Sequence, residues 1–255
     1  MVEAYHITPI QKFSRGESDQ VNEGIIVEQS VSLTVNGKVW LTFMCSPVDL
    51  EALAIGFLYN ENIITSMAEV ADVRVCEHYD NVDVWLTKTI EEPKNWRRTS
   101  GCTGGYTTAV LEEVQPVPPD YVVLTPDEIL ALIRNLFESQ DIYRKSGGVH
   151  SSALATPEGL LFQLEDVGRH NTLDKIAGRI LMDDLHVDHK IILTTGRISS
   201  EMLQKAARMQ ASMLVSRTSP TSMSIDLAHR LGITLIGYAR GHRFNVYSHP
   251  ERVDL

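Results

Sequence analysis

The chain has 255 residues, with 33 Asp and Glu against 23 Lys and Arg, so its formal net charge is −10. A hydrophobic share of 43% and a charged share of 22% are typical of a folded, water-soluble protein. The acidic balance argues against general binding to nucleic acid or to an anionic membrane, because like charges repel. No apolar run approaches the roughly 18 residues of a membrane helix. The first residues lack the basic and apolar segments of a signal peptide, so we expect a cytoplasmic protein.

The first half of the chain has the pattern of short strands around one helix. Residues 24–34 are rich in Val and Ile, and Asn36-Gly37 separates them from a second strand-like run at residues 39–44. An Asn-Gly pair between two such runs predicts a β-hairpin, because both residues tolerate positive φ. The pattern further predicts a helix over residues 50–59 and strands over residues 70–76 and 82–87.

A proline-rich connector at residues 115–120 follows, and proline both fixes φ and cannot donate to a sheet. We place a domain boundary there, with a β-rich N-terminal domain over residues 1–115 and an α/β domain over residues 120–255. Thr125, Pro126 and Glu128 combine an N-cap, a proline at the first helical position and a capping-box acid. They predict a helix that runs to about Ser139.

Beyond that helix, strand-like and helix-like segments alternate. Strands are predicted at residues 152–155, 160–164, 190–194, 213–216 and 234–238, and helices at 171–182, 199–209 and 219–232. Ser219-Pro220 is the predicted start of the last helix, and Gly232 its end. Such alternation indicates an α/β class fold, a layered sheet with helices on both faces.

The loops that follow four of these strands all carry arginine. They supply Arg169, Arg197, Arg217 and Arg240, most of them beside Gly, Ser or Thr. Ligands of open α/β sheets bind in the loops at the carboxyl ends of the strands. Arginine forks and helix N-termini both bind phosphate, so we infer a large polyanionic ligand with phosphates. The alternative is that single loop arginines pair with surface carboxylates. None of the loops matches a P-loop or a GxGxxG motif.

Two residues of these loops have open interpretations. His170 is either an acid/base group or a residue that caps the next helix and fixes the loop. Asp166 either holds Arg169 in place or contacts a ligand donor such as a guanine edge. The loop residues that we assign to ligand binding here are Asp166, Gly168, Arg169, His170, Gly196, Arg197 and Ser219.

The three cysteines, Cys45, Cys76 and Cys102, are too far apart for a CxxC zinc site and too few for a disulfide framework. Cys102 lies in a glycine-flanked loop with Arg97 and Arg98 close by. Cations favour the thiolate, and glycine leaves room for a second macromolecule to reach the sulfur. We interpret Cys102 as a reactive thiol, the alternative being an exposed bystander. Cys45 and Cys76 lie in strand-like surroundings and are predicted to be buried and inert.

Together these segments resemble the formate dehydrogenase accessory sulfurtransferase family, called FdhD. The resemblance covers nearly the whole chain, and its most specific string is EDVGRHN-LDK at residues 165–175. The other matching motifs are Gly147-Gly148-Val149-His150, residues 195–201, Ser219-Pro220-Thr221, residues 237–240, Asn36-Gly37 and residues 54–58.

The resemblance implies a specific activity. Proteins of this family take persulfide sulfur from a cysteine desulfurase onto a loop cysteine, here Cys102. They pass it to the bis-molybdopterin guanine dinucleotide cofactor of molybdenum or tungsten, which the catalytic subunit of formate dehydrogenase needs. The family's C-terminal domain has a three-layer fold like that of cytidine deaminase and is usually a homodimer. It binds the cofactor by its guanosine phosphate ends, which GDP or GMP would mimic. The matching cofactor segment here is Tyr238, Ala239, Arg240, Gly241, His242 and Arg243.

One departure keeps other functions open. Many family members carry CxxC at the sulfur loop, whereas residues 102–105 here hold only the first cysteine. A persulfide needs one sulfur, but release by a neighbouring resolving thiol is not possible. The alternatives are a chaperone that inserts the cofactor without sulfur transfer, and a plain guanine-nucleotide-binding protein. A zinc deaminase is excluded, because His150-Ser151-Ser152 lacks the glutamate of His-x-Glu and no PCxxC is present; we expect no zinc and no other metal ligands.

Overall fold

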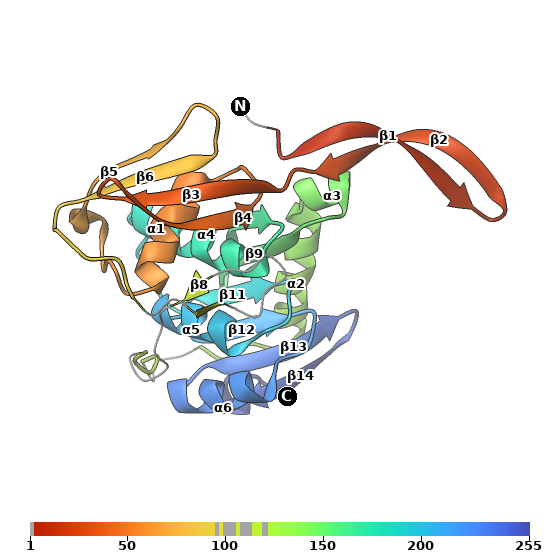
Figure 1. The fold of residues 1–255 in the computed structure, drawn as a ribbon. Helices are drawn as coiled ribbons and strands as arrows, with labels where there is room; N and C mark the ends of the chain where they lie inside the picture. The colour runs from red at the N-terminus through yellow and green to blue at the C-terminus, as the bar shows by residue number, and fades with distance from the viewer. Residues whose placement is uncertain (1–2, 95–96, 99–105, 108–113, 119–121) are drawn as a thin grey trace.

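The computed structural model describes residues 3–94, 97–98, 106–107, 114–118 and 122–255. Its two larger sheets have four and six strands, and a long two-stranded ribbon projects from the body (Figure 1). The four-stranded sheet comes from the chain before residues 115–120, and the six-stranded sheet from the chain after them. A fourth, two-stranded sheet pairs β7 (Arg97–Arg98) with β8 (Tyr106–Thr107).

The four-stranded sheet has the order β4-β3-β6-β5. The predicted hairpin is confirmed: the chain turns at Asn36 and Gly37, whose φ values are 49° and 78°. Both residues lie in the left-handed region that a tight hairpin turn of this kind requires. The predicted helix and the two later strands are also confirmed. The elements are β3 (Gln29–Val35), β4 (Lys38–Cys45), α1 (Leu50–Asn60), η1 (Met67–Glu69), β5 (Val70–Val75) and β6 (Asn81–Leu86).

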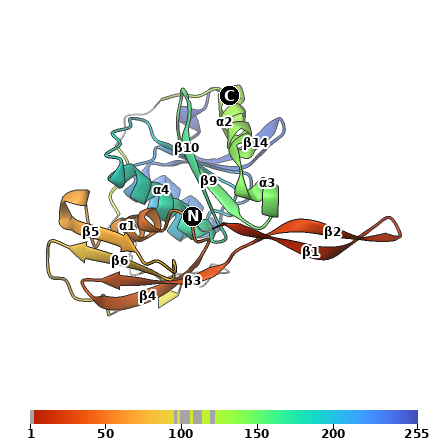
Figure 2. The ribbon, with the colours of Figure 1, turned by 90° about the horizontal axis from the view of Figure 1, so that it is seen from above.

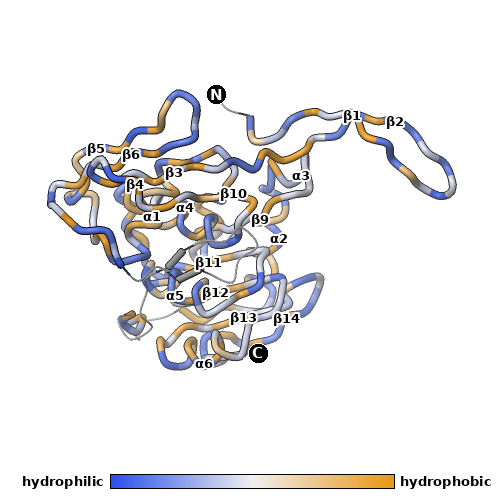
Figure 3. The backbone as a smooth tube through the Cα atoms, viewed as in Figure 1, coloured by the Kyte–Doolittle hydropathy of each residue, from blue (hydrophilic) through white to orange (hydrophobic). Residues whose placement is uncertain are grey.

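The projecting ribbon consists of β1 (Tyr5–Ser14) and β2 (Glu17–Ile26), paired antiparallel. The single strand predicted over residues 24–34 is therefore wrong: its first residues end β2, and the chain starts a new strand, β3, at Gln29. The ribbon extends well beyond the rest of the molecule in two perpendicular views (Figures 1 and 2). Hydrophobic residues are interspersed with hydrophilic ones along it (Figure 3).

The six-stranded sheet has the order β10-β9-β11-β12-β13-β14. Its strands β11, β12 and β13 are parallel. Strand β9 pairs antiparallel with β11, and β10 and β14 extend the sheet as hairpin partners of β9 and β13. The five predicted strands are confirmed, and β14 is an addition. Their bounds are β9 (His150–Thr156), β10 (Gly159–Asp166), β11 (Ile191–Thr194), β12 (Met213–Ser216), β13 (Thr234–Arg240) and β14 (Arg243–Ser248).

Helices cover both faces of this sheet, as predicted. Alternate strand residues such as Leu154 and Ile192 pack with α4, α5 and α6, whereas their neighbours Ala153 and Ile191 pack with α2. The mixed α/β class is therefore confirmed. The helices are α2 (Pro126–Ser139), α3 (Ile142–Ser146), α4 (Arg169–Met182), α5 (Ser200–Arg208), α6 (Ser222–Leu231) and η3 (Pro250–Arg252).

The caps of these helices follow the sequence in two cases and not in a third. The Thr125 side chain accepts a hydrogen bond from Glu128 N, and the Ser199 side chain accepts one from Met202 N, as predicted. The predicted start of the last helix at Ser219-Pro220 is wrong. Thr221 caps α6, and Pro220 instead bridges to Ile198 on the neighbouring loop.

The two larger sheets are joined by the packing of α1 on α4. A Cβ atom on Gly56 would overlap the carbonyl oxygen of Asp174, and one on Gly178 would overlap that of Ala52. Glycine at both positions therefore lets the two backbones touch. Beside this contact, Asn60 Nδ2 donates to Asp174 Oδ1 at 2.8 Å. No helix in the described part of the chain is long and apolar enough to cross a membrane.

Candidate functional site

The strand directions bring the arginine-bearing loops to one side of the six-stranded sheet. Strand β10 runs parallel to β11, since both are antiparallel to β9. The carboxyl ends of β10, β11, β12 and β13 therefore lie at one edge, together with the start of β9. We call this the carboxyl-end edge; its strand-end residues are His150, Asp166, Thr194, Ser216 and Arg240. The predicted convergence of the loops is confirmed, and the ligand-binding roles of their residues remain predictions.

Hydrogen bonds tie the neighbouring loops together. Arg217 N donates to Thr194 O at 3.3 Å, and Tyr238 N donates to Thr218 O at 3.0 Å. Ser219 O accepts from Ile198 N, so Ser219 supports the adjacent loop through its backbone. These backbone hydrogen bonds fix the positions of the loops relative to one another.

Asp166 lies beneath this edge rather than on it. Its carboxylate and the Lys175 ammonium are 2.7 Å apart, and both side chains are 0% exposed. Asp166 also accepts hydrogen bonds from Ser46 N, Gly168 N and the Asn171 side chain. Every one of these donors belongs to the protein, so the geometry favours a positioning role for Asp166 over direct contact with a ligand. The role of Gly168 is likewise structural here, as the N-cap residue of α4.

Arg169 and His170 form the first turn of α4 and are largely buried. The helix therefore starts two residues before its predicted position, and His170 is inside it rather than at its cap. A Cβ on Gly196 would come within 3.0 Å of Arg169 Cβ, so this glycine lets the arginine lie across the next loop. We call the exposed surface of the carboxyl-end edge the rim; Arg169 lies below it, because its side chain is largely buried.

His170 Nε2 lies 3.1 Å from Glu201 Oε2 and 3.3 Å from Ser199 Oγ, both at the start of α5. Burial lowers the pKa of His170, although its hydrogen bond to Glu201 opposes the change. Burial raises the pKa of Glu201, but the His170 hydrogen bond and nearby cations outweigh it and bring the pKa below its usual value. A neutral imidazole thus donates to a carboxylate, which fixes the start of α4 to the start of α5.

Sequence reasoning did not assign a role to His150, although it occurs in the Gly147–His150 motif. The half-buried ring lies at the carboxyl-end edge, with Nδ1 3.4 Å from Thr195 Oγ1. Thr195 Oγ1 already accepts from Ser151 N, so its hydroxyl hydrogen is free to point at Nδ1. Burial and the positive charge of Arg169 lower the pKa of His150. The residue is a neutral imidazole beside the start of α4.

Three arginines at the edge remain exposed. Within the described part of the chain, Arg197, Arg217 and Arg240 form no ion pair with a carboxylate. Arg217 stacks instead on the Phe137 ring at 4.5 Å, and Arg240 lies 5.7 Å from the Tyr238 ring. Among the described residues, no surface acid is found that these three arginines neutralise, and the alternative interpretation gains no support there.

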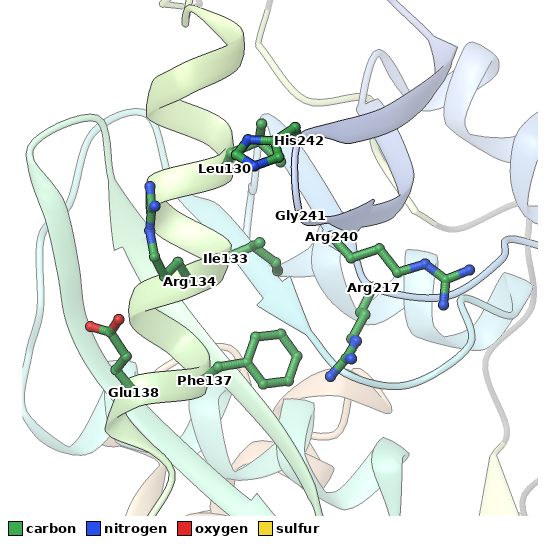
Figure 4. A pocket seen from close by; sticks show the side chains of 9 residues that line it. All are labelled: Leu130, Ile133, Arg134, Phe137, Glu138, Arg217, Arg240, Gly241 and His242. Carbon is green, nitrogen blue, oxygen red and sulfur yellow. The ribbon is translucent and has the colours of Figure 1, made fainter.

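Arg217 and Arg240 line a cavity of about 440 Å³ between α2 and the turn that joins β13 to β14 (Figure 4). Helix α2 supplies an apolar wall that includes Phe137, whose ring faces Arg217 in the close-up view. A hollow with an aromatic wall and several cations fits a flat ring that carries phosphates. The lining residues are Leu130, Ile133, Arg134, Phe137, Glu138, Arg217, Arg240, Gly241 and His242.

The segment predicted as a loop after β13 is a β-hairpin. Tyr238 to Arg240 end β13, Gly241 and His242 form the turn, and Arg243 opens β14. A bulge between Gly237 and Arg240 interrupts the pairing, and Tyr238 adopts a φ of 54° there. Bulges redirect side chains, and Arg240 lines the cavity while Ala239 is buried beneath it. Phe137 is a residue that sequence reasoning missed, because a half-buried aromatic on an amphipathic helix is indistinguishable from core.

The cysteines differ from one another. Cys45 is buried, and burial, with a smaller effect from Asp166, raises the pKa of its thiol to about 12. This confirms the prediction of an inert thiol. The predicted burial of Cys76 is wrong, since Cys76 follows β5, is half-buried and has Sγ 2.9 Å from Asp80 Oδ1; its inertness remains a prediction. Cys102 and its flanking glycines lie outside the described residues.

Metal-ligating side chains do not gather at this site. Among the residues that the structure describes, no group of three or more His, Cys, Asp and Glu side chains is arranged to hold a metal ion. The carboxyl-end edge offers guanidinium groups, helix N-termini and two neutral histidines instead. Fold and site together define a mixed α/β protein whose carboxyl-end edge carries exposed arginines and helix N-termini, groups that can bind phosphate.

Comparison with known proteins then places the chain. The model of the FdhD/NarQ family matches residues 26–254, so the chain belongs to this family. A relative from Bacillus subtilis (strain 168), named Sulfur carrier protein FdhD, is 33% identical over 253 residues, which are 97% of this chain and 97% of the relative. A relative of the same name from Bacillus licheniformis is 36% identical over 252 residues, 96% of each chain.

A solved structure supports the fold. It is the crystal structure of a protein from Desulfotalea psychrophila described as a candidate formate dehydrogenase accessory protein. The TM-score is 0.84 and the identity 31%, over 98% of this chain and 100% of that one. The two proteins therefore share the whole architecture.

Proposed function

We propose that this protein is a sulfurtransferase that carries persulfide sulfur on Cys102 from a cysteine desulfurase to the bis-molybdopterin guanine dinucleotide cofactor destined for formate dehydrogenase. The observation that carries the proposal is its membership of a family whose relatives, alike over nearly their whole length, are named sulfur carrier proteins. The cytoplasm is the proposed compartment, and the catalytic subunit of formate dehydrogenase is the proposed recipient. The metal cofactor is substrate here, not a resident group.

The acceptance step needs a single thiol. The Cys102 thiolate attacks the outer sulfur of the donor's persulfide, a new S–S bond forms at Cys102, and the donor cysteine leaves as a thiolate. No net oxidation occurs, and no second cysteine is needed. Delivery of the sulfur as sulfide needs two electrons, which we assign to an external thiol that forms a mixed disulfide with Cys102. That thiol replaces the resolving cysteine of CxxC relatives.

The carboxyl-end edge is the proposed cofactor site. Arg217 and Arg240 are exposed, lack carboxylate partners in the described part of the chain, and lie beside the Phe137 ring. Phosphate ends of the guanosine moieties would bind to the guanidinium groups, and a base would lie against the aromatic wall. Arg169, His170 and Asp166 would hold the start of α4 in place rather than change protonation during transfer.

The decisive experiment is mass spectrometry of the full chain after incubation with a cysteine desulfurase and cysteine. A gain of one sulfur atom on Cys102, lost in Cys102→Ala and retained in Cys76→Ser, is expected. Cys76→Ser is the matched control because Cys76 is half-buried, whereas Cys45 is buried. GDP binding by Cys102→Ala should equal that of the parent chain.

The same experiment tests the rival function. If the parent chain gains no sulfur yet binds the cofactor and restores formate dehydrogenase activity, the protein is a chaperone that inserts the cofactor. If GDP binds tightly and the pterin cofactor does not compete with it, the protein is a guanine-nucleotide-binding protein of another kind.

A further inference from the structure

His150 is the first residue of β9, the strand that lies between β10 and β11 in the six-stranded sheet. It pairs with Asp166 at the end of β10, and Thr195, which follows β11, lies on its other side. The imidazole therefore lies between two of the arginine-bearing loops of the carboxyl-end edge, those of Arg169 and Arg197.

One nitrogen of this ring is held by the protein and the other is not. Nδ1 lies 3.4 Å from Thr195 Oγ1, whereas no residue in the described part of the chain forms a hydrogen bond with Nε2. Nε2 is not one of the buried side-chain atoms, so solvent reaches it. His170 differs, because its Nε2 lies against Ser199 and Glu201 inside the protein. His150 therefore presents one nitrogen to a ligand at the edge.

The contact with Thr195 suits both a neutral and a protonated ring. When the imidazole is neutral, the Thr195 hydroxyl donates to Nδ1, and Nε2 carries the proton. When the imidazole is protonated, the hydroxyl accepts from Nδ1–H, because an oxygen that already accepts from Ser151 N still has a second lone pair. The ring thus keeps its orientation, and Nε2–H is a donor in both states.

Two charged groups from neighbouring elements act on the ring. The Arg169 cation at the start of α4 opposes protonation, and the Asp166 carboxylate at the end of β10 favours it. Burial has the largest effect, and together these influences lower the pKa of His150 from its usual 6.5. The free protein therefore holds a neutral ring near neutral pH. An anion beside Nε2 would reverse this balance, because it favours the charged form of the imidazole.

We propose that His150 is a ligand-contacting residue of the carboxyl-end edge, which donates from Nε2 to a phosphate oxygen and takes up a proton as the phosphate binds. This inference rests on the proposed cofactor site and adds a proton-linked contact to it. The negative charge of the phosphate offsets the repulsion from Arg169, so the pKa of His150 rises on binding. The edge thus gains a positive charge when an anion occupies it, whereas an arginine at this position would repel Arg169 at all times.

The test is isothermal titration calorimetry of GDP binding to the full chain at pH 5.5, 6.5 and 7.5. GDP itself gains a proton on its terminal phosphate at about pH 6, so the informative quantity is the ratio of the affinities of the parent and His150→Gln. Glutamine keeps a hydrogen-bond donor but takes up no proton. The ratio should be about threefold or less at pH 7.5 and about tenfold or more at pH 5.5, because a charge-assisted hydrogen bond is the stronger one.

Two kinds of control separate this contact from a general effect. His186→Gln removes an exposed histidine from the segment that leads into β11, at the opposite end of the strand, and should match the parent at every pH. Thr195→Val removes the hydroxyl that holds Nδ1 and should flatten the pH dependence of the ratio. Thr195→Ser keeps the hydroxyl and should restore that dependence, which a purely structural role of the side chain would not do.

A second measurement needs no variant of His150. NMR titration of the histidine rings of the parent chain, with His150 assigned through its contact with Thr195, should show that GDP raises the pKa of this ring. An unchanged pKa overturns the proposal, and so do equal affinities of the parent and His150→Gln at every pH; GDP binding by the parent would then still support the cofactor site. A parent chain that binds no GDP overturns the cofactor site and this inference together.

Discussion

Two sets of charged residues at the carboxyl-end edge behave in opposite ways. Below the rim, Asp166 and Lys175 are 0% exposed and satisfied by each other and by neighbouring backbone and side-chain groups. On the rim, Arg217 and Arg240 are exposed and touch aromatic rings. The first set fixes the geometry of the edge, and the second leaves donors free for a ligand. The charged residues of one edge therefore include buried groups that support the loops and exposed groups that a ligand can reach. Burial is what distinguishes the two sets.

The largest effect is expected when the buried ion pair of Asp166 and Lys175 is broken. Lys175→Met leaves the Asp166 carboxylate buried without its cation, which should lower the free energy of unfolding by about 3–5 kcal/mol. The control, Lys12→Met, removes an exposed partner of Glu23 and should cost at most about 1 kcal/mol. Urea unfolding monitored by circular dichroism gives both values. Similar losses for the two variants would show that burial does not distinguish these charges.

A smaller effect is expected at the rim. Arg240→Ala should weaken GDP binding by about 1.5–3 kcal/mol, the worth of a charge-assisted hydrogen bond, and leave stability unchanged. Arg230→Ala, an exposed arginine of α6 remote from the cavity, is the matched control. Isothermal titration calorimetry provides the affinities. Equal affinities for Arg240→Ala and the parent would exclude Arg240 from the site.

The histidine below the rim should give the protein an acid-sensitive stability. Burial lowers the pKa of His170 below its usual 6.5, so the unfolded chain takes up a proton before the folded chain does. Stability is then unaffected above pH 6.5 and falls as the pH drops below it, by at most about 1.4 kcal/mol per pH unit. Urea unfolding at pH 7.5 and 5.5 should show a smaller loss in His170→Gln than in the parent, whereas the exposed control His186→Gln should match the parent.

The smallest effect lies far from the edge. Thr125→Ala removes the capping box of α2, the helix that forms the apolar wall of the cavity. A lost N-cap costs about 1 kcal/mol, and thermal unfolding should detect it. GDP affinity should change less than in Arg240→Ala, because the cap lies at the other end of the helix from Phe137. A larger change in affinity than in stability would mean that the cap contacts the ligand.

The sequence predicted correctly those features whose conformation depends on residues close to one another in the chain. Asn36-Gly37 predicts its hairpin because the turn conformation depends on those two residues, and Thr125 with Glu128 predicts a cap for the same reason. The loops with arginine were predictable because carboxyl ends of parallel strands share an edge. The helix start predicted at Ser219-Pro220 was wrong because Pro220 forms a β-bridge with Ile198, a residue distant in sequence.

The remaining features depend on tertiary structure. The ribbon strands alternate weakly and contain Gly, Pro and many polar residues, so periodicity did not reveal them. Burial of Asp166 depends on Ser46, which lies 120 residues away in the sequence, as well as on Lys175 in the following helix α4. Phe137 has the spacing of a core residue, and only the position of the Arg217 guanidinium shows that its ring faces a cavity.

The glycine contact between α1 and α4 has a consequence for how the chain can be divided. Helix α4 begins at the site with Arg169, and in its middle Gly178 lies against the backbone of α1. Ser46 and Asn60, from the first half of the chain, bind the buried carboxylates of Asp166 and Asp174. A fragment that began after residue 120 would leave those acids short of partners. We therefore expect the two sheets to unfold together, and a fragment of residues 121–255 to be less stable than the full chain.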